Sequence, residues 1–253
     1  MYSFKEKLIN KEVVLGTMLS EIYTPNIVRM LARAKFEYLF VDCEHGYFDF
    51  IELANIAAVG RGFGINIIVR VPSVSREFIT KVLDIGVDGL LLPQIDNADL
   101  AKQAVMLSKY VPEGKRGIST TRAHTDYHVD SVAAYAKEAN KNLILLAQIE
   151  SQEGLKNVND IAATPGIDGI IVGPNDMAGD FNQPGETFSD EMKVRIKSVI
   201  AACNQVNKPV GIVDAKIERL KYWQKEGMSI FCMGSEIHLL MSASKNIIKS
   251  FSE

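Results

Sequence analysis

Polar side chains that could bind a metal or move protons stand at the ends of several short apolar runs in this sequence. Glu150 ends one run, and Asp176 follows the next run along the chain. If these runs form adjacent strands, two ionised carboxylates would repel each other unless a cation lay between them. An all-oxygen site without cysteine or a histidine pair favours Mg2+ or Mn2+, with Co2+ as a further candidate. We therefore expect Glu150 and Asp176 to bind a divalent metal.

A structural alternative exists for both carboxylates. Asp176 follows a Gly-Pro pair and could cap a helix, while Glu150 could form a salt bridge with a lysine.

Three further residues suit catalysis beside such a metal. Arg70 ends an apolar run, where a guanidinium can stabilise a developing oxyanion or bind a carboxylate through two nitrogens, although a salt bridge at the rim is the alternative. His45 lies three residues after Asp42 and can exchange a proton near neutral pH if a carboxylate orients its ring. The remaining histidines lack such neighbours, and we expect structural or loop roles for His124, His128 and His238.

Other kinds of site find little support. No lysine ends an apolar run, which disfavours a Schiff base, and Lys216 is the nearest candidate. No glycine-rich nucleotide motif is present. We expect the cysteines to be packing residues, because their odd number and wide separation fit neither disulfides nor a zinc site; they are Cys43, Cys203 and Cys232.

The elements that would position these residues follow a repeating pattern. Eight short apolar runs alternate with longer segments of helical periodicity, such as 76–86, 98–110 and 191–207. The runs are VVLGTML (13–19), YLFVDCE (38–44), NIIVRV (66–71), GLLLPQ (89–94), LILLAQIE (143–150), GIIVGP (169–174), PVGIVD (209–214) and SIFCMGS (229–235). Such runs are typical of parallel strands that are buried on both faces. We predict that residues 1–253 form one (β/α)8 barrel (TIM barrel) rather than an open doubly wound sheet, with polar strand ends at the active site.

Two segments depart from the repeat. Residues 111–130 have no sustained period, and we interpret this long connection as an active-site loop. The tail predicts a helix with a broad apolar stripe, which would pack either on its own barrel or on a neighbouring subunit. The stripe contains Ile237, Leu240, Met241, Ile247, Ile248 and Phe251.

Composition narrows the partners and the compartment. The net charge is -3 and the sequence has no basic cluster, so we expect small-molecule ligands and no nucleic acid. No segment has the uninterrupted apolar length of a membrane span, and the first residues do not resemble a secretion signal. We expect a cytoplasmic protein without membrane contact.

The motifs together resemble the HpcH/HpaI aldolases, which are metal-dependent class II pyruvate aldolases such as 4-hydroxy-2-oxoheptanedioate and 2-dehydro-3-deoxyglucarate aldolases. The resemblance extends over nearly the whole chain, and the order of its elements makes it specific. These elements are VDCEHG (41–46), VRVP (69–72), DIGVDGLLLPQIDNADLAKQAV (84–105), PEGKRG (112–117), QIES (148–151) and VGPNDMA (172–178).

The resemblance implies a role for each candidate residue. Glu150 and Asp176 would bind the metal, and Arg70 would stabilise the enolate oxygen. His45, oriented by Asp42, would act as the base through a water molecule.

The substrate side and the assembly follow from the same resemblance. The expected substrate-binding residues are Gln148, Gly173, Asn175 and Arg70. A 4-hydroxy-2-oxo acid would be cleaved reversibly to pyruvate and an aldehyde, through a pyruvate enolate held at the metal. The family fold also implies a homo-oligomer, built from dimers that exchange their last helix and commonly hexameric.

The sequence departs from the family pattern beside the expected metal. Asn175 stands where a small residue is usual, Met177 replaces a common leucine, and the segment 120–128 differs after its Arg-Ala pair. We expect a more polar or narrower pocket floor there, so the resemblance does not identify the aldehyde that the enzyme uses.

Two other functions remain alternatives at this stage. One is an oxo-acid decarboxylase or related lyase that uses the same enolate chemistry, and the other is a non-catalytic barrel that binds a metabolite.

Overall fold

A closed barrel of parallel strands forms the centre of the protein. The computed structural model describes residues 3–252. Each strand pairs with the next along the chain, and β8 closes the barrel on β1. The strands are β1 (Val14–Leu19), β2 (Tyr38–Asp42), β3 (Asn66–Arg70), β4 (Gly89–Leu92), β5 (Ile144–Ile149), β6 (Gly169–Val172), β7 (Val210–Val213) and β8 (Ile230–Ser235). Each predicted run contains one of these strands, so the prediction of a (β/α)8 barrel is confirmed.

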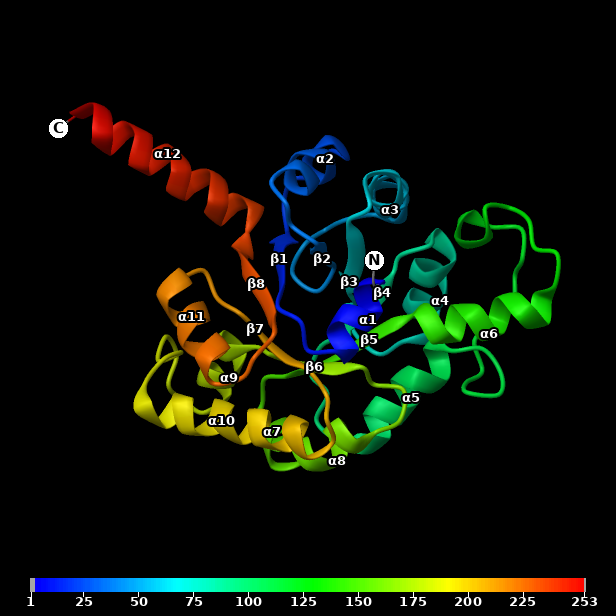
Figure 1. Ribbon diagram of the computed structural model, residues 1–253. Helices are drawn as coiled ribbons and strands as arrows, with labels where there is room; N and C mark the ends of the chain where they lie inside the picture. The colour runs from blue at the N-terminus through cyan, green and yellow to red at the C-terminus, as the bar shows by residue number, and fades with distance from the viewer. Residues whose placement is uncertain (1–2, 253) are drawn as a thin grey trace.

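Helices surround the barrel and connect successive strands (Figure 1). They are α1 (Phe4–Ile9), α2 (Asn26–Arg33), α3 (Phe50–Phe63), α4 (Arg76–Ile85), α5 (Ala98–Ser108), the 3-10 turn η1 (Ala123–Thr125), α6 (Val132–Asn142), α7 (Gln152–Lys156), α8 (Val158–Ala163), α9 (Pro174–Asp180), α10 (Asp190–Gln205), α11 (Ile217–Lys225) and α12 (Glu236–Ser252). None of the helices within residues 3–252 has both the length and the apolarity that a membrane span requires.

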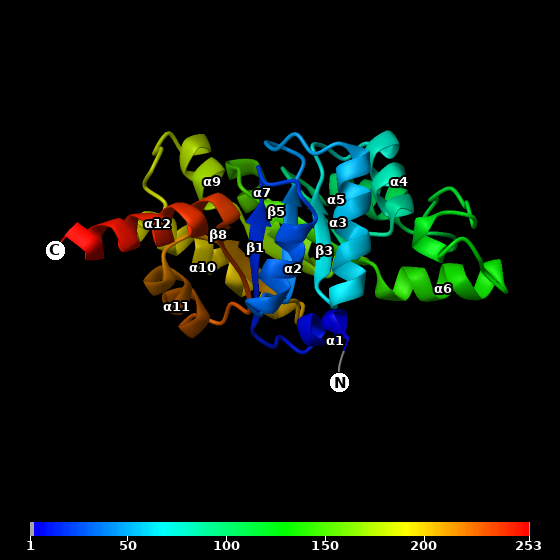
Figure 2. The same cartoon turned by 90° about the horizontal axis from the view of Figure 1, so that it is seen from above.

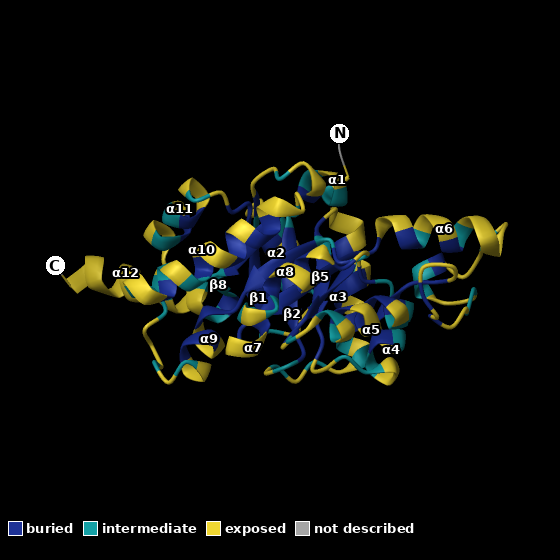
Figure 3. Ribbon diagram, turned by 90° about the horizontal axis from the view of Figure 1, so that it is seen from below, coloured by how far each residue is buried: buried dark blue, intermediate teal, exposed yellow. Residues whose placement is uncertain are grey.

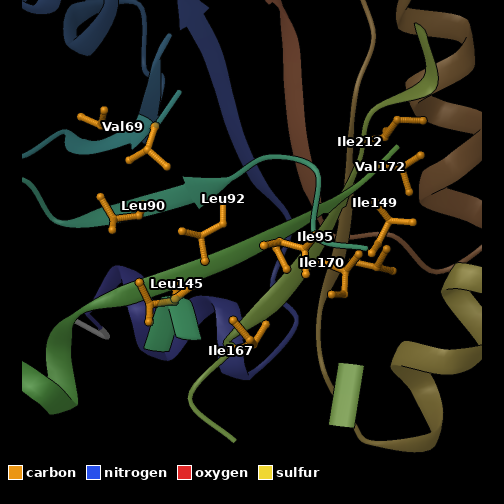
Figure 4. Close-up of a cluster of buried hydrophobic side chains, with 14 of the residues drawn as sticks. Val69, Leu90, Leu92, Ile95, Leu145, Ile149, Ile167, Ile170, Val172 and Ile212 are labelled. Carbon is orange, nitrogen blue, oxygen red and sulfur yellow. The ribbon is translucent and has the colours of Figure 1, made fainter. Parts of the chain in front are cut away.

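Side chains alternate between two apolar regions along each strand, as the pleat of a strand requires. One region fills the barrel interior and includes Tyr38, Phe40 and Ile68. The other lies between the strands and the helices, and Figure 4 shows part of it around Leu90 and Ile149. The burial colours of Figure 3 show the barrel as the buried centre of the molecule. The next inward-facing residues, beyond the apolar interior, therefore lie at the carboxyl ends of the strands.

Side-chain caps begin several helices directly after the strand ends. Asp49 and Glu52 form a capping box at the start of α3, and Ser75 and Ser151 cap α4 and α7. These caps satisfy main-chain N–H groups that would otherwise lack acceptors. They also fix where the loops at the carboxyl face end.

The segment 111–130 does not lie at that face, so its prediction as an active-site loop is wrong. The Ala123 carbonyl accepts from Nη1 of Arg61 over 3.2 Å, and Nδ1 of His124 lies 3.1 Å from the carbonyl oxygen of Asp84. Both partners stand near the last turns of α3 and α4, at the end of the barrel where the strands begin. The segment lacks a period because it forms a 3-10 turn followed by Asp126 and Tyr127 with positive φ.

The last helix leaves the barrel instead of packing along it. Figures 1 and 2 show α12 projecting from the end of β8, and most of its surface is exposed in Figure 3. Of the two alternatives for the tail, packing on its own barrel is therefore not observed.

Candidate active site

A buried ion pair joins the ends of β2 and β3. Asp42 and Arg70 are register partners, so both side chains point into the mouth of the barrel. Nε of Arg70 donates to Oδ1 of Asp42 over 2.9 Å, and Nη2 donates to Oδ2 over 2.6 Å. Burial opposes ionisation of this carboxyl, but the guanidinium lowers the pKa of Asp42 below its ordinary value. The pair fixes the orientation of the Arg70 guanidinium.

Asp42 also organises the turn that carries His45. Its Oδ1 accepts from the main-chain N–H groups of Glu44 and His45, over 3.0 and 3.3 Å. The His45 ring is exposed, and no hydrogen bond between this ring and Asp42 occurs among the contacts described for residues 3–252. The structure thus connects Asp42 and His45 through the main chain.

Glu150 is a buried carboxylate of the same site that is not paired with Arg70. It follows β5, is 4% exposed, and accepts from the Gln94 main-chain N–H through Oε1 over 2.7 Å. Oε2 accepts from Nε2 of Gln148. Burial first, and then the charges of Glu44 and Asp176, raise the pKa of Glu150 to about 7.

Asp176 stands at the mouth of the same site. It lies in the first turn of α9 and is exposed, and its charge contributes to raising the pKa of both Glu44 and Glu150. The N-cap position of α9 belongs to Gly173. The contacts described for Glu150 are with amide groups and not with a lysine. Neither structural alternative for these carboxylates is therefore observed.

The charge balance of the site suits a cation. The charges of three carboxylates, Asp42, Glu44 and Glu150, act on the Arg70 guanidinium, and Oε2 of Glu44 lies 3.2 Å from its Nη1. Residues 3–252 contain no group of three or more histidine, cysteine or acidic side chains arranged as metal ligands. The two carboxylates Glu150 and Asp176 thus fit a hard cation that takes its other oxygen ligands from substrate and water.

Gly173 keeps the space beside Glu150 open. A Cβ atom at this position would lie 2.6 Å from Oε2 of Glu150 and 2.7 Å from Nε2 of Gln148. The Oε1 atom of Gln148 is buried without a hydrogen-bond partner in the part of the chain described. A substrate or water donor would satisfy this oxygen, in keeping with the predicted role of Gln148.

A cavity of about 370 Å3 adjoins this site at the ends of β1, β7 and β8. Met18 contributes to its wall and also contacts Nη2 of Arg70 through Sδ at 4.0 Å, so the cavity and the Arg70 site share a boundary. Its polar lining residues are Asn175, Thr187, Asp214, Lys216, Arg219, Ser235 and His238.

Met177 and Asn175 lie in different surroundings, although both stand beside the expected metal in the sequence. Met177 is fully buried in the apolar region outside the strands, so the expectation that it shapes the pocket floor is wrong. Asn175 is exposed and lines the cavity, as expected for a residue that changes the pocket. The prediction of packing roles is confirmed for the cysteines, which are buried and free: Cys43, Cys203 and Cys232.

Sequence reasoning assigned no role to Glu44 and Gln94. Glu44 contacts Arg70, and the Nε2 atom of Gln94 lies 3.4 Å from Oε1 of Glu44. Their position at strand ends was a usable signal for both, but the contact of the Gln94 main chain with Glu150 has no sequence signature.

Comparisons with known proteins agree with this geometry. A family model described as HpcH/HpaI aldolase/citrate lyase matches residues 18–243. The 5-keto-4-deoxy-D-glucarate aldolase of Enterobacter sp. (strain 638) is 35% identical over 98% of this chain and 96% of its own length. The HpcH/HpaI aldolase structure from Desulfitobacterium hafniense DCB-2 has a TM-score of 0.94 and 29% identity, covering 100% of this chain and 98% of that one. The citrate synthase SbnG has a TM-score of 0.87 and 26% identity, covering 99% and 98%.

The raised pKa of Glu150 predicts a pH-dependent stability of the metal-free protein. Below pH 4.5 the group is protonated in both states, and stability is lost as the pH rises through about 7, because folding opposes ionisation. The loss should approach about 1.4 kcal/mol per pH unit within this window. Glu150→Gln should remove it. Urea denaturation of both proteins at pH 5 and pH 8 in EDTA measures the difference, and equal pH profiles would contradict the assignment.

Proposed function

This chain belongs to the HpcH/HpaI aldolase/citrate lyase family, and we propose that it is a divalent-metal-dependent aldolase that cleaves a 4-hydroxy-2-oxo acid into pyruvate and an aldehyde. The observation that carries the proposal is the buried Glu150 carboxylate. The charges of Asp176 and Arg70 act in the same site, and Glu150 accepts hydrogen bonds from amide groups rather than from a cationic side chain. Mg2+ or Mn2+ suits these oxygen ligands best.

The bound cation would supply Lewis-acid polarisation of the 2-oxo group. Glu150 and Asp176 would hold it, while Gln148 offers its unpaired Oε1 to a donor beside it. Arg70 would lie toward the oxygen that becomes negative, because Asp42 and Glu44 hold its guanidinium in one orientation. These residues prepare the site for an enolate oxygen.

Proton transfer falls to His45. In the cleavage direction the 4-hydroxyl proton leaves, the bond between C3 and C4 breaks, and the electron pair forms the pyruvate enolate while C4 becomes the aldehyde carbon. C3 is then protonated to give the pyruvate methyl group. His45 stands exposed at the mouth, where it can accept and return these protons through water. Asp42 positions it by holding the main chain of its turn.

The adjoining cavity is the place for the aldehyde half of the substrate. Its lining offers hydrogen-bond donors from Asn175, Lys216 and His238, which favours a hydroxylated aldehyde over an aliphatic one. The Enterobacter relative is named for a hydroxylated oxo diacid, in agreement with a polar substrate class for this chain.

We also propose that the active form is a homo-oligomer in which α12 packs on a second copy of the chain. The first residue of α12 is anchored, since Oε1 of Glu236 accepts from the N–H groups of Ser20 and Glu21 over 2.9 and 2.7 Å. The rest of the helix carries exposed apolar side chains, including Phe251 at 92% exposure. A solvated apolar stripe of this size is typical of an interface. Exposed members of the stripe are Leu240, Met241, Ile247, Ile248 and Phe251.

Deuterium exchange into the pyruvate methyl group tests the enolate half of the proposal. EDTA and Glu150→Ala should each abolish exchange, and His45→Ala should slow it by about 100-fold or more because a proton acceptor is lost. His128→Ala, in the exposed segment 111–130, is the control and should exchange normally. Exchange that persists without a divalent metal would refute the mechanism.

The aldehyde preference can be measured in the synthetic direction with pyruvate as donor. Glycolaldehyde should have a kcat/KM about tenfold above that of acetaldehyde, because its hydroxyl can bind a charged or amide donor of the cavity. Lys216→Met should narrow this ratio. Equal values for the two aldehydes in the parent enzyme would argue against the polar pocket.

The interface is tested by one charge on each side of α12. Ile247→Glu should dissociate the oligomer, because a carboxylate would be buried without a partner. Asn246→Glu, which changes a neighbouring residue outside the apolar stripe, should leave the oligomer intact. Light scattering after size exclusion measures the mass, and a monomeric parent chain would show the proposal to be wrong.

A further inference from the structure

We propose that Gln94 is a positioning residue for the metal site, and that its left-handed main chain holds the Glu150 carboxylate ready for the cation. The inference rests on the proposed function, because it takes Glu150 as a metal ligand. It goes beyond that function by requiring a particular backbone conformation in the residue after β4. The side chain of this residue need not bind metal or substrate.

The backbone of Gln94 adopts a conformation that most side chains avoid. Gln94 follows Pro93 after β4 and has a φ of +51°. The left-handed region disfavours residues with a Cβ atom and is most costly for β-branched ones. Outliers of this kind persist where surrounding contacts require them, often at functional sites.

The contacts made by this turn lead directly to β5. The Gln94 N–H lies 2.7 Å from Oε1 of Glu150, and the next N–H, of Ile95, donates to the Gln148 carbonyl over 3.2 Å. The unusual φ therefore places two successive donors on the strand that carries Glu150. The φ of Gln94 sets the orientation of the Ile95 N–H relative to the Gln94 N–H, so a turn in the ordinary right-handed or extended region would not bring both donors to β5 together.

The donor on Oε1 fixes the proposed ligand from one side. Nε2 of Gln148 donates to the other oxygen, so each oxygen of Glu150 accepts one hydrogen bond and keeps a second lone-pair site. Donors to ligating carboxylates set the orientation of the ligand, and their loss commonly costs about 10-fold to 100-fold in metal affinity. The Gln94 N–H has the position and the distance for this role.

The Gln94 side chain extends the connection to the other half of the site. Its Nε2 atom lies 3.4 Å from Oε1 of Glu44, whose Oε2 atom lies 3.2 Å from Nη1 of Arg70. One residue thus contacts the proposed metal ligand and the carboxylate that holds the arginine. The side chain is exposed and its contact is long, so we assign the larger effect to the main chain.

Substitutions that differ in their tolerance of a left-handed backbone separate the main chain from the side chain. Gln94→Gly and Gln94→Asn tolerate this conformation and keep the N–H, although neither retains the Gln side chain. Gln94→Val also keeps an N–H, but its β-branched side chain opposes the conformation. The Mn2+ dissociation constant of the full-length protein, measured by calorimetry without substrate, reports the effect independently of turnover.

Gln94→Gly and Gln94→Asn should bind Mn2+ within about threefold of the parent, and Gln94→Val should bind about tenfold or more weakly. Lys35→Val is the matched control, because Lys35 has a φ of +74° in an exposed turn at the opposite end of the barrel. It should lose stability without losing Mn2+ affinity, so a general effect of strain would be recognised.

Parent-like Mn2+ affinity in Gln94→Val would overturn the inference. Equal weakening in the Gly, Asn and Val variants would also overturn it, because the side chain would then be responsible. Glu150→Ala distinguishes this failure from that of the proposed function: if Glu150→Ala binds Mn2+ like the parent, the metal site itself is wrong. Weak binding in Glu150→Ala with normal binding in Gln94→Val would reject only the role of Gln94.

Discussion

Burial of negative charge at the carboxyl end of the barrel accounts for the contacts that organise the site. Asp42 and Glu44 share the guanidinium of Arg70, whereas the hydrogen bonds described for Glu150 within residues 3–252 come from amide donors. An isolated buried carboxylate is costly, and proteins relieve the cost by protonation or by a cation. Burial raises the pKa of Glu150 and so favours the first outcome, and metal binding would give the second.

The barrel can hold this arrangement because an apolar interior lies directly below the charged layer. Apolar side chains fill its interior up to the layer just below Asp42 and Arg70, so the charged layer need not stabilise the fold. The register between β2 and β3 makes Asp42 and Arg70 neighbours, and that between β5 and β6 places Gly173 beside Glu150. A rigid scaffold can thus hold a carboxylate in an environment that opposes its ionisation.

The two segments that depart from the strand–helix repeat, 111–130 and α12, lie in different parts of the structure. The segment 111–130 packs beside α3 and α4 at the amino end of the barrel, while α12 extends into solvent from its first turn. Glu236 holds the loop after β1 at the root of α12, so this helix begins beside the mouth of the site. The proposed α12 interface and the active site would therefore meet at one short loop.

Local pattern was enough to predict the barrel, its strands and the polar residues at their ends. Apolar runs are properties of neighbouring residues, so they placed Asp42, Arg70 and Glu150 at strand ends before any contact was known. Tertiary structure alone decided that Asp42 binds Arg70, that Glu44 joins them, and that Gln94 reaches Glu150 through a left-handed turn. It also placed 111–130 away from the site. These outcomes depend on strand register and on contacts between residues far apart in the chain, which no local period encodes.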